Sequence, residues 1–119
     1  MEAPHPFAPL RGHKYLSLIT FRRNGTAVPT PVWFAENDGR LYVMTRSDSG
    51  KYKRIRNRSQ VRVASCTARG RITGPEIPAI ARILPDDAVA RRALAGKYWL
   101  MRVPWLWSRK NIFLEIRPS

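Results

Sequence analysis

Two turn signals, each lying between runs of alternating residues, restrict the N-terminal half of this chain to antiparallel β-structure. Asn24-Gly25 is the pair that two-residue hairpins prefer, because both positions accept positive φ angles at low cost. Asn37-Asp38-Gly39 is a second signal of the same kind. The segments around these turns are predicted to form three strands of an antiparallel meander, at 15–22, 26–35 and 40–45.

The rest of the chain predicts three more strands and two short helices. Alternating β-rich segments lie at 60–66, 77–84 and 111–117, the second weakened by Pro78. A helix is predicted over 49–58, and another after Pro85, where Asp86 is a good N-cap. We expect one domain at 15–119, preceded by an N-terminal arm at 1–14. The prediction is a mainly β fold, a small closed or split barrel, because closure removes exposed sheet edges.

The junction between the third strand and the first helix has the composition of a phosphate site. Ser49, Gly50 and Lys51 lie where the N–H groups of a helix start lack partners and point at an anion. Ser49 can cap the helix and offer a hydroxyl, Gly50 permits close backbone approach, and Lys51 supplies charge. The pattern lacks the first glycine of a P-loop. The residues predict an anion without identifying it.

Pro29 and Pro31 lie two apart in the second predicted strand. Alternate residues direct their N–H groups to the same side, so that side of the strand lacks two donors. One edge is therefore expected to be unpaired. It could face a flat aromatic ligand beside Thr30, Val32 and Trp33, or be an ordinary edge strand guarded by prolines, and geometry favours neither.

The segment 98–107 is too apolar to face water and holds three of the chain's tryptophans. We expect burial against the body of the domain or against a second subunit, with contact at a membrane surface as the weaker alternative. No run approaches the roughly 18 apolar residues of a membrane span, and no signal peptide is recognisable, so a cytoplasmic location is expected.

A net charge of +14, from 22 basic and 8 acidic residues, attracts polyanions such as nucleic acid, acidic lipids or a phosphorylated cofactor. The single cysteine, Cys66, excludes an internal disulfide and a cysteine-cluster metal site. His5 and His13 stand alone near the N-terminus and are interpreted as solvated, so no metal is expected.

Three stretches in this order resemble the pyridoxamine-phosphate-oxidase-like superfamily, and more narrowly its deazaflavin-dependent oxidoreductases. They are 28–34 (VPTPVWF), 38–43 (DGRLYV) and 49–57 (SGKYKRIRN). The resemblance covers roughly 15–84 and includes the final strand. It departs after the basic helix, where the family often has Asn-Pro and this chain has Asn57-Arg58-Ser59. The resemblance implies a six-stranded antiparallel split β-barrel of the FMN-binding type, usually a homodimer with the cofactor between subunits.

Carried over from the family, the resemblance also implies a set of cofactor-binding residues. The phosphate would be held by Ser49, Gly50 and Lys51, with Thr45 near the phosphate or polyol. Lys53 and Arg54 would neutralise the phosphate or an acidic tail. The ring would be lined by Thr30, Pro31 and Val32.

The charge around the predicted helix favours coenzyme F420, the deazaflavin, over FMN. FMN carries one phosphate, whereas F420 adds a lactyl and polyglutamate tail with further negative charges. One phosphate needs less positive charge than the predicted helix and its end carry together, at Lys51, Lys53, Arg54, Arg56 and Arg58. We find no Ser-His-Asp, paired-carboxylate or metal constellation, so no catalytic residue is assigned. Hydride transfer would belong to the cofactor, with a small organic substrate that the sequence does not identify.

Three other functions remain open at this point. The protein could bind FMN, as other members of the superfamily do, or carry a cofactor without turnover. A third alternative is a basic nucleic-acid-binding barrel, which binds single strands by aromatic stacking and phosphate contacts. This last function is disfavoured, because the aromatic residues gather in 98–107 and do not interleave with the arginines of the helix.

Overall fold

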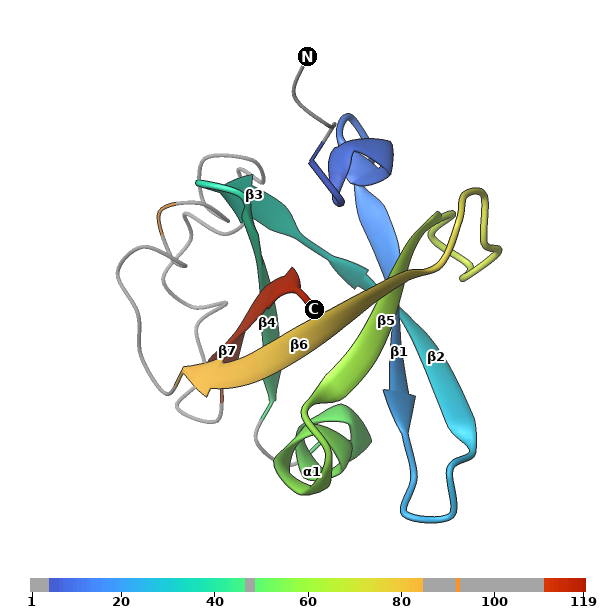
Figure 1. Ribbon diagram of the computed structural model, residues 1–119, viewed down its shortest axis with the longest axis vertical. Coiled ribbons are helices and arrows are strands. Elements are labelled where there is room, and N and C mark those ends of the chain that lie inside the picture. Colours follow the sequence, from blue (N-terminus) through green and yellow to red (C-terminus); the bar gives the residue numbers. More distant parts are fainter. Residues whose placement is uncertain (1–4, 47–48, 85–91, 93–110) are drawn as a thin grey trace.

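Seven strands form one antiparallel sheet in the computed structural model, which describes residues 5–46, 49–84, 92 and 111–119 (Figure 1). The strands are β1 (Tyr15–Phe21), β2 (Ala27–Trp33), β3 (Ala35–Asn37), β4 (Arg40–Arg46), β5 (Gln60–Cys66), β6 (Ile77–Leu84) and β7 (Asn111–Pro118). Their order across the sheet is β2-β1-β5-β6-β7-β4-β3. The helix α1 (Gly50–Asn57) joins β4 to β5, and a short 3₁₀ helix, η1 (Ala8–Leu10), precedes β1.

The connection between β2 and β3 forces the sheet to curl. These two strands are the opposite edges of the sheet, yet Phe34 alone separates them in the chain. A flat sheet with this order would hold its edges about 29 Å apart, six spacings of about 4.8 Å. Trp33 and Ala35 are two residue steps apart, and two steps span at most about 7 Å. The sheet therefore bends round until its edges meet at Phe34 without pairing, which is a split barrel.

Both predicted hairpins are confirmed, but only the second has a two-residue turn. Asp38 and Gly39 have φ of 54° and 76° between β3 and β4, whereas the five residues 22–26 separate β1 from β2, and there Gly25 has a φ of 89° while Asn24 is not among the residues with positive φ. The count of six strands becomes seven, because the strand expected over 26–35 divides at Phe34. The mainly β, antiparallel split-barrel architecture is confirmed.

The core fills the inside of the curled sheet. Each strand sends alternate residues inward. The buried cluster contains Leu16, Leu18, Leu41, Val43, Val61, Val63, Ala79, Ala81, Leu114 and Ile116, with Phe7, Leu10, Phe34, Ile55 and Ile77. Ile55 is the one buried residue of α1, so this helix contributes a narrow apolar face to the core.

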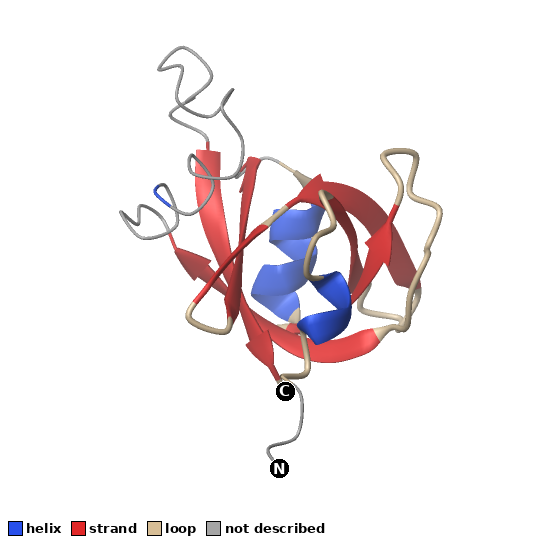
Figure 2. Ribbon diagram, turned by 90° about the horizontal axis from the view of Figure 1, so that it is seen from above, coloured by secondary structure: helices blue, strands red, loops and turns tan. Residues whose placement is uncertain are grey.

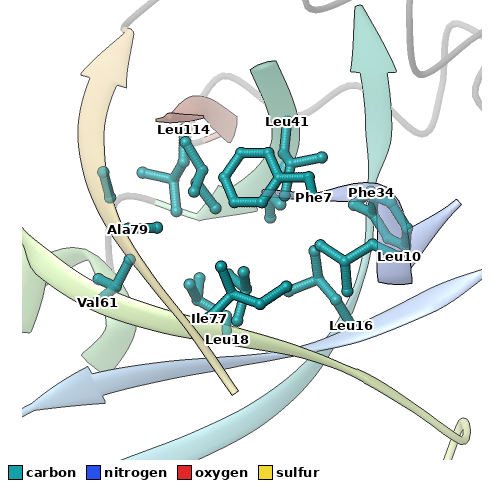
Figure 3. Close-up of a cluster of buried hydrophobic side chains, with 14 of the residues drawn as sticks. Phe7, Leu10, Leu16, Leu18, Phe34, Leu41, Val61, Ile77, Ala79 and Leu114 are labelled. Carbon is teal, nitrogen blue, oxygen red and sulfur yellow. The ribbon is translucent and has the colours of Figure 1, made fainter. Parts of the chain in front are cut away.

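The two helices lie at opposite ends of the barrel, and the strands surround them when the molecule is viewed from above (Figures 1 and 2). At the end near η1, Phe7 and Leu10 are almost fully buried. Figure 3 shows Phe7 inside the apolar cluster, near Leu41 and Phe34. His5 accepts a hydrogen bond from the Phe7 N–H through Nδ1 at 3.1 Å, so this histidine is part of the local fold.

Two expectations fall outside the described residues: the helix after Pro85 and the apolar segment 98–107. Among the helices of the described ranges, none is both long and apolar enough to cross a membrane.

Burial of Phe7 predicts that the segment before β1 is needed for stability. Phe7→Ala removes a side chain that is 0% exposed, and we expect it to lower the free energy of unfolding by about 3–5 kcal/mol. Ile72→Ala is the control, because Ile72 is 41% exposed and should cost less than about 1 kcal/mol. Urea denaturation of the three proteins measures both values. Equal stability of the Phe7 and Ile72 variants would show that the segment is dispensable.

Candidate functional site

The start of α1 is capped by Ser49, as the sequence predicts. The hydroxyl oxygen of Ser49 accepts a hydrogen bond from the Tyr52 N–H at 3.2 Å, and its carbonyl accepts one from the Lys53 N–H at 3.4 Å. The N–H groups of Gly50 and Lys51 precede the first intrahelical bond, so they are donors that a helix start leaves open. Together with the positive end of the helix dipole, they favour an anion here.

The hydroxyls of Ser49 and Thr45 form one hydrogen bond with each other, which uses only one of their two hydroxyl hydrogens. Their Oγ atoms lie 3.2 Å apart, and either can be the donor. Thr45 is buried at the inner face of β4 and Ser49 is half-buried. Two hydroxyls carry two hydrogens and their mutual bond uses one, so whichever hydroxyl accepts keeps a hydrogen to donate elsewhere. Thr45, expected near the cofactor phosphate or polyol, thus lies beside the residue that caps α1.

Arg54 folds back over the start of the helix. Its Nε donates to Oγ1 of Thr20 at 2.6 Å, which ties α1 to β1. A Cβ at Gly50 would lie 2.7 Å from Nη1 of Arg54, so the absent side chain makes room for the guanidinium. Residues four apart share one helix face. Gly50 does not have a positive φ, so its backbone conformation does not require glycine. Glycine suits this position because a side chain would collide with the Arg54 guanidinium.

Lys51 is half-buried beside this guanidinium. Burial lowers the pKa of the Lys51 ammonium below its usual 10.5, and the nearby Arg54 lowers it further. Burial, then Arg22 of the β1–β2 turn, lowers the pKa of Arg54 as well. Among the described residues, no ion pair includes Lys51, Arg54 or Arg22. Three cations thus gather at this helix start without a described carboxylate between them.

The remaining basic residues of α1 are placed differently. Lys53 is exposed. Arg56 lies over the Tyr52 ring at 5.6 Å, and Arg58 over the Phe21 ring at 5.1 Å. Arg58 is the C-cap, at the far end of an eight-residue helix about 12 Å long. The charge that the sequence places along the helix is therefore concentrated at its start by Lys51, Arg54 and Arg22.

The three expected ring-lining residues do not share one face of β2. Thr30 and Val32 are half-buried and point inward, opposite Leu18 and Leu16 of β1. Pro31 points outward and is exposed, close to Gly70 of the β5–β6 loop. As the two prolines predict, β2 is an edge strand, and among the described strands it pairs only with β1. The inner face of β2 thus offers Thr30 and Val32 without Pro31.

Thr20 is a site residue that the sequence analysis did not identify. It is fully buried on the inner face of β1, where its neighbours Leu16 and Leu18 belong to the core. Its Oγ1 also donates to the Val28 carbonyl of β2 at 3.5 Å. A polar residue at an inward position of an apolar strand was the available signal. Thr20 connects the helix start to the strand that carries Thr30.

The arrangement at the start of α1 is a set of donors: backbone N–H groups, one hydroxyl hydrogen, an ammonium and a guanidinium. Such a set suits a phosphate, which accepts through several oxygens. In the part of the chain that the structure describes, no three His, Cys, Asp or Glu side chains lie together as a metal site requires.

Solved structures share this fold. A candidate pyridoxamine 5'-phosphate oxidase from Listeria innocua is 17% identical, with a TM-score of 0.72 over 95% of this chain and 90% of that one. An F420 reductase is 18% identical, with a TM-score of 0.66 over 99% and 96%. HutZ, the heme storage protein of Vibrio cholerae, is 12% identical, with a TM-score of 0.72 over 92% and 84%. No protein-family model and no curated protein matches the sequence.

These similarities confirm the fold that the sequence resemblance implies. The chain shares the split-barrel fold of these solved structures. At this level of identity the similarity shows the architecture alone.

The pKa of Lys51 predicts a conflict between stability and anion binding. Because folding lowers this pKa, the charged ammonium destabilises the cofactor-free protein at pH 7, and the penalty is relieved as pH rises through the lowered pKa. We expect Lys51→Met to raise the free energy of unfolding at pH 7, with a smaller difference from the wild type toward pH 10. Denaturant titrations across this range measure it. The exposed Lys53→Met should stay within about 0.5 kcal/mol of the wild type. A Lys51→Met variant less stable than the wild type at pH 7 would contradict the claim that folding lowers the pKa of Lys51.

Proposed function

We propose that this protein is an oxidoreductase that binds a phosphorylated flavin-type cofactor at the start of α1, with coenzyme F420 as the cofactor and FMN as the alternative. The observation that carries the proposal is the set of hydrogen-bond donors there. Lys51, Arg54 and Arg22 gather at an open helix start with no described acidic partner. Binding a phosphate would supply the missing negative charge.

Each residue of the site has a role that its position supports. The N–H groups of Gly50 and Lys51, with the free hydrogen of the Thr45–Ser49 pair, would hold the phosphate oxygens. Lys51 and Arg54 would neutralise it. Thr30 and Val32, on the inner face of β2, would lie along the ring, while Pro31 keeps the strand edge unpaired.

The cofactor would supply the chemistry, transfer of a hydride between its ring and a small organic substrate. The chain contributes binding, orientation and exclusion of water. Thr20 positions Arg54 through its hydrogen bond and links that guanidinium to β2, so the phosphate and ring ends of the site are held by one connected set of contacts.

The preference for F420 over FMN depends on protein cations in addition to those that a single phosphate would neutralise. Arg56 and Arg58 are engaged by aromatic rings, which leaves Lys53 and Arg22 as the additional cations near the helix start. An acidic tail could extend along them. The F420 reductase among the similar structures supports this choice, whereas the fold of HutZ is equally compatible with a protein that carries a cofactor without turnover.

We expect the site to be completed by a second copy of the chain, in a cytoplasmic homodimer. The apolar composition of the segment 98–107 and the resemblance to split-barrel proteins support this assembly. Sedimentation equilibrium at micromolar concentration should give about twice the 13.7 kDa mass of the chain. A single species at the mass of one chain would contradict the dimer.

Cofactor titrations of matched variants test the site itself. Lys51→Met removes a charge-assisted contact worth roughly 1.5–3 kcal/mol, so we expect about ten-fold to more than a hundred-fold weaker binding of F420 or FMN, followed by cofactor fluorescence. Lys53→Met should cost less, because exposed charges are screened. Arg69→Met, an exposed cation of the β5–β6 loop, makes the same charge change outside the site.

The pattern among these variants decides the proposal. A loss confined mainly to Lys51→Met supports a specific phosphate contact. Equal losses for all three would mean that only the overall charge attracts the cofactor. Saturable binding of F420 in preference to FMN would select the deazaflavin, and turnover with a reduced cofactor would separate an enzyme from a carrier.

A further inference from the structure

A second group of arginines surrounds a pocket on the outer face of β4, β6 and β7. The pocket has a volume of about 340 Å³. The described residues that line it are Arg40, Arg82, Arg117, Glu115, Ser59, Ile80 and Ala81. Its three arginines and one glutamate leave two net positive charges. A pocket of this size falls at the small end of the range for bound organic molecules.

Glu115 holds two of the arginines in place. This carboxylate is buried on β7 and accepts a hydrogen bond from the Tyr42 hydroxyl at 3.4 Å. Arg82 approaches both of its oxygens at 3.4 Å, and Arg40 lies 3.6 Å from Oε2. Tyr42 and Arg82 are the cross-strand partners of Glu115 in the sheet. Tyr42, Glu115 and Arg82 thus form a row across three neighbouring strands, while more than half of the Arg40 and Arg82 side chains stays open to solvent.

Arg117 is the cation that this carboxylate does not pair. It lies two residues after Glu115 on the same face of β7, about 7 Å along the strand, and it is the cross-strand partner of Ile80. The Arg117 side chain forms no hydrogen bond or ion pair with any described residue. Three guanidiniums therefore line the pocket while its one carboxylate pairs with two of them, and an anion in the pocket would relieve the remaining repulsion.

We propose that this pocket binds a phosphate monoester of a small molecule. A guanidinium presents parallel N–H donors that match two oxygens of a phosphate, and a phosphate offers three terminal oxygens to the three arginines. A monoester phosphate carries close to two negative charges above its second pKa, near 6, which equals the surplus in the pocket. Ile80 and Ala81 give the esterified group an apolar surface.

This pocket is separate from the site at the start of α1. Ser59, which lines the pocket, follows the C-terminal end of that helix, and its carbonyl accepts a bond from the Ala81 N–H at 2.9 Å. Ser49 caps the other end, about 12 Å away along the helix. The pocket would bind its anion whether or not a flavin-type cofactor binds at Ser49.

Calorimetric titration with inorganic phosphate and phenyl phosphate, at pH 8 and constant ionic strength, tests the proposal. The titrations use Lys51→Met as the background, so that the α1 site contributes little. We expect one saturable site, with Arg117→Gln weakening it about ten-fold or more. Arg117→Lys should restore part of the affinity, because it keeps the charge and loses the paired donors. Phenyl phosphate should bind at least as tightly as inorganic phosphate.

Arg69→Gln is the control, because it makes the same charge change on the exposed β5–β6 loop and should weaken binding less than two-fold. Arg117 has no described partner, so its replacement is expected to leave folding intact, which circular dichroism checks. Absence of a saturable phosphate site, or equal losses for the Arg117 and Arg69 variants, would overturn the proposal. Cofactor titration of Arg117→Gln separates this test from the test of the α1 site, because the Arg117 substitution should leave cofactor binding unchanged.

Discussion

The single residue between β2 and β3 is the constraint on which the rest of the fold depends. Because Phe34 alone joins the two edge strands, the sheet cannot remain flat, and its inner face becomes an enclosed core. A curled sheet is open at its ends, and the chain places η1 near one end and α1 near the other (Figure 1). Phe34 itself is buried with Phe7 and Leu10, so the point where the edges meet is also packed.

The position of α1 explains why cations gather at its start. An eight-residue helix is marginal alone and is held by packing and capping. Here one buried residue, Ile55, the Ser49 cap and the Arg54–Thr20 bond attach it to the barrel. The same contacts bring Arg54 against Lys51, and burial makes both charges unfavourable without an anion. Binding energy at this site would therefore include relief of repulsion that the fold itself creates.

Local features were predictable from the sequence, whereas features that depend on distant pairing were not. Asp38-Gly39 forms its two-residue turn and Ser49 caps its own helix, so these two predictions hold to the residue, while Asn24-Gly25 marks the place of the first hairpin within a longer turn. The division of the second predicted strand at Phe34 depends on which strands lie at the two edges, and the sequence does not contain that order in any local pattern.

The same distinction applies to the sites. The cluster at Ser49, Gly50 and Lys51 is contiguous and could be found by composition. Thr20 lies 34 positions before Arg54, and their contact follows from the packing of α1 on β1. Glu115 lies 33 positions after Arg82 and reaches it only through the pairing of β6 with β7. Contacts of this kind require the register of the sheet, because a shift of one residue would send each side chain to the opposite face.

The net charge of +14 says little until each cation is assigned a partner. Arg56 and Arg58 lie over aromatic rings, where their charge is partly compensated. Arg11 pairs with Glu36, and Arg40 and Arg82 share Glu115.

Lys51, Arg54 and Arg117 differ from these arginines, since none of them has a carboxylate partner among the described residues. Each lies beside another cation or a carboxylate already shared by two arginines, in a position set by the sheet or the helix. A solvated charge could turn away from such a neighbour at little cost, but the Arg54–Thr20 bond limits this for Arg54, and the strand register keeps Arg117 on the face of β7 that carries Glu115. Positive groups held together by the fold therefore point to anion sites more strongly than the overall charge does.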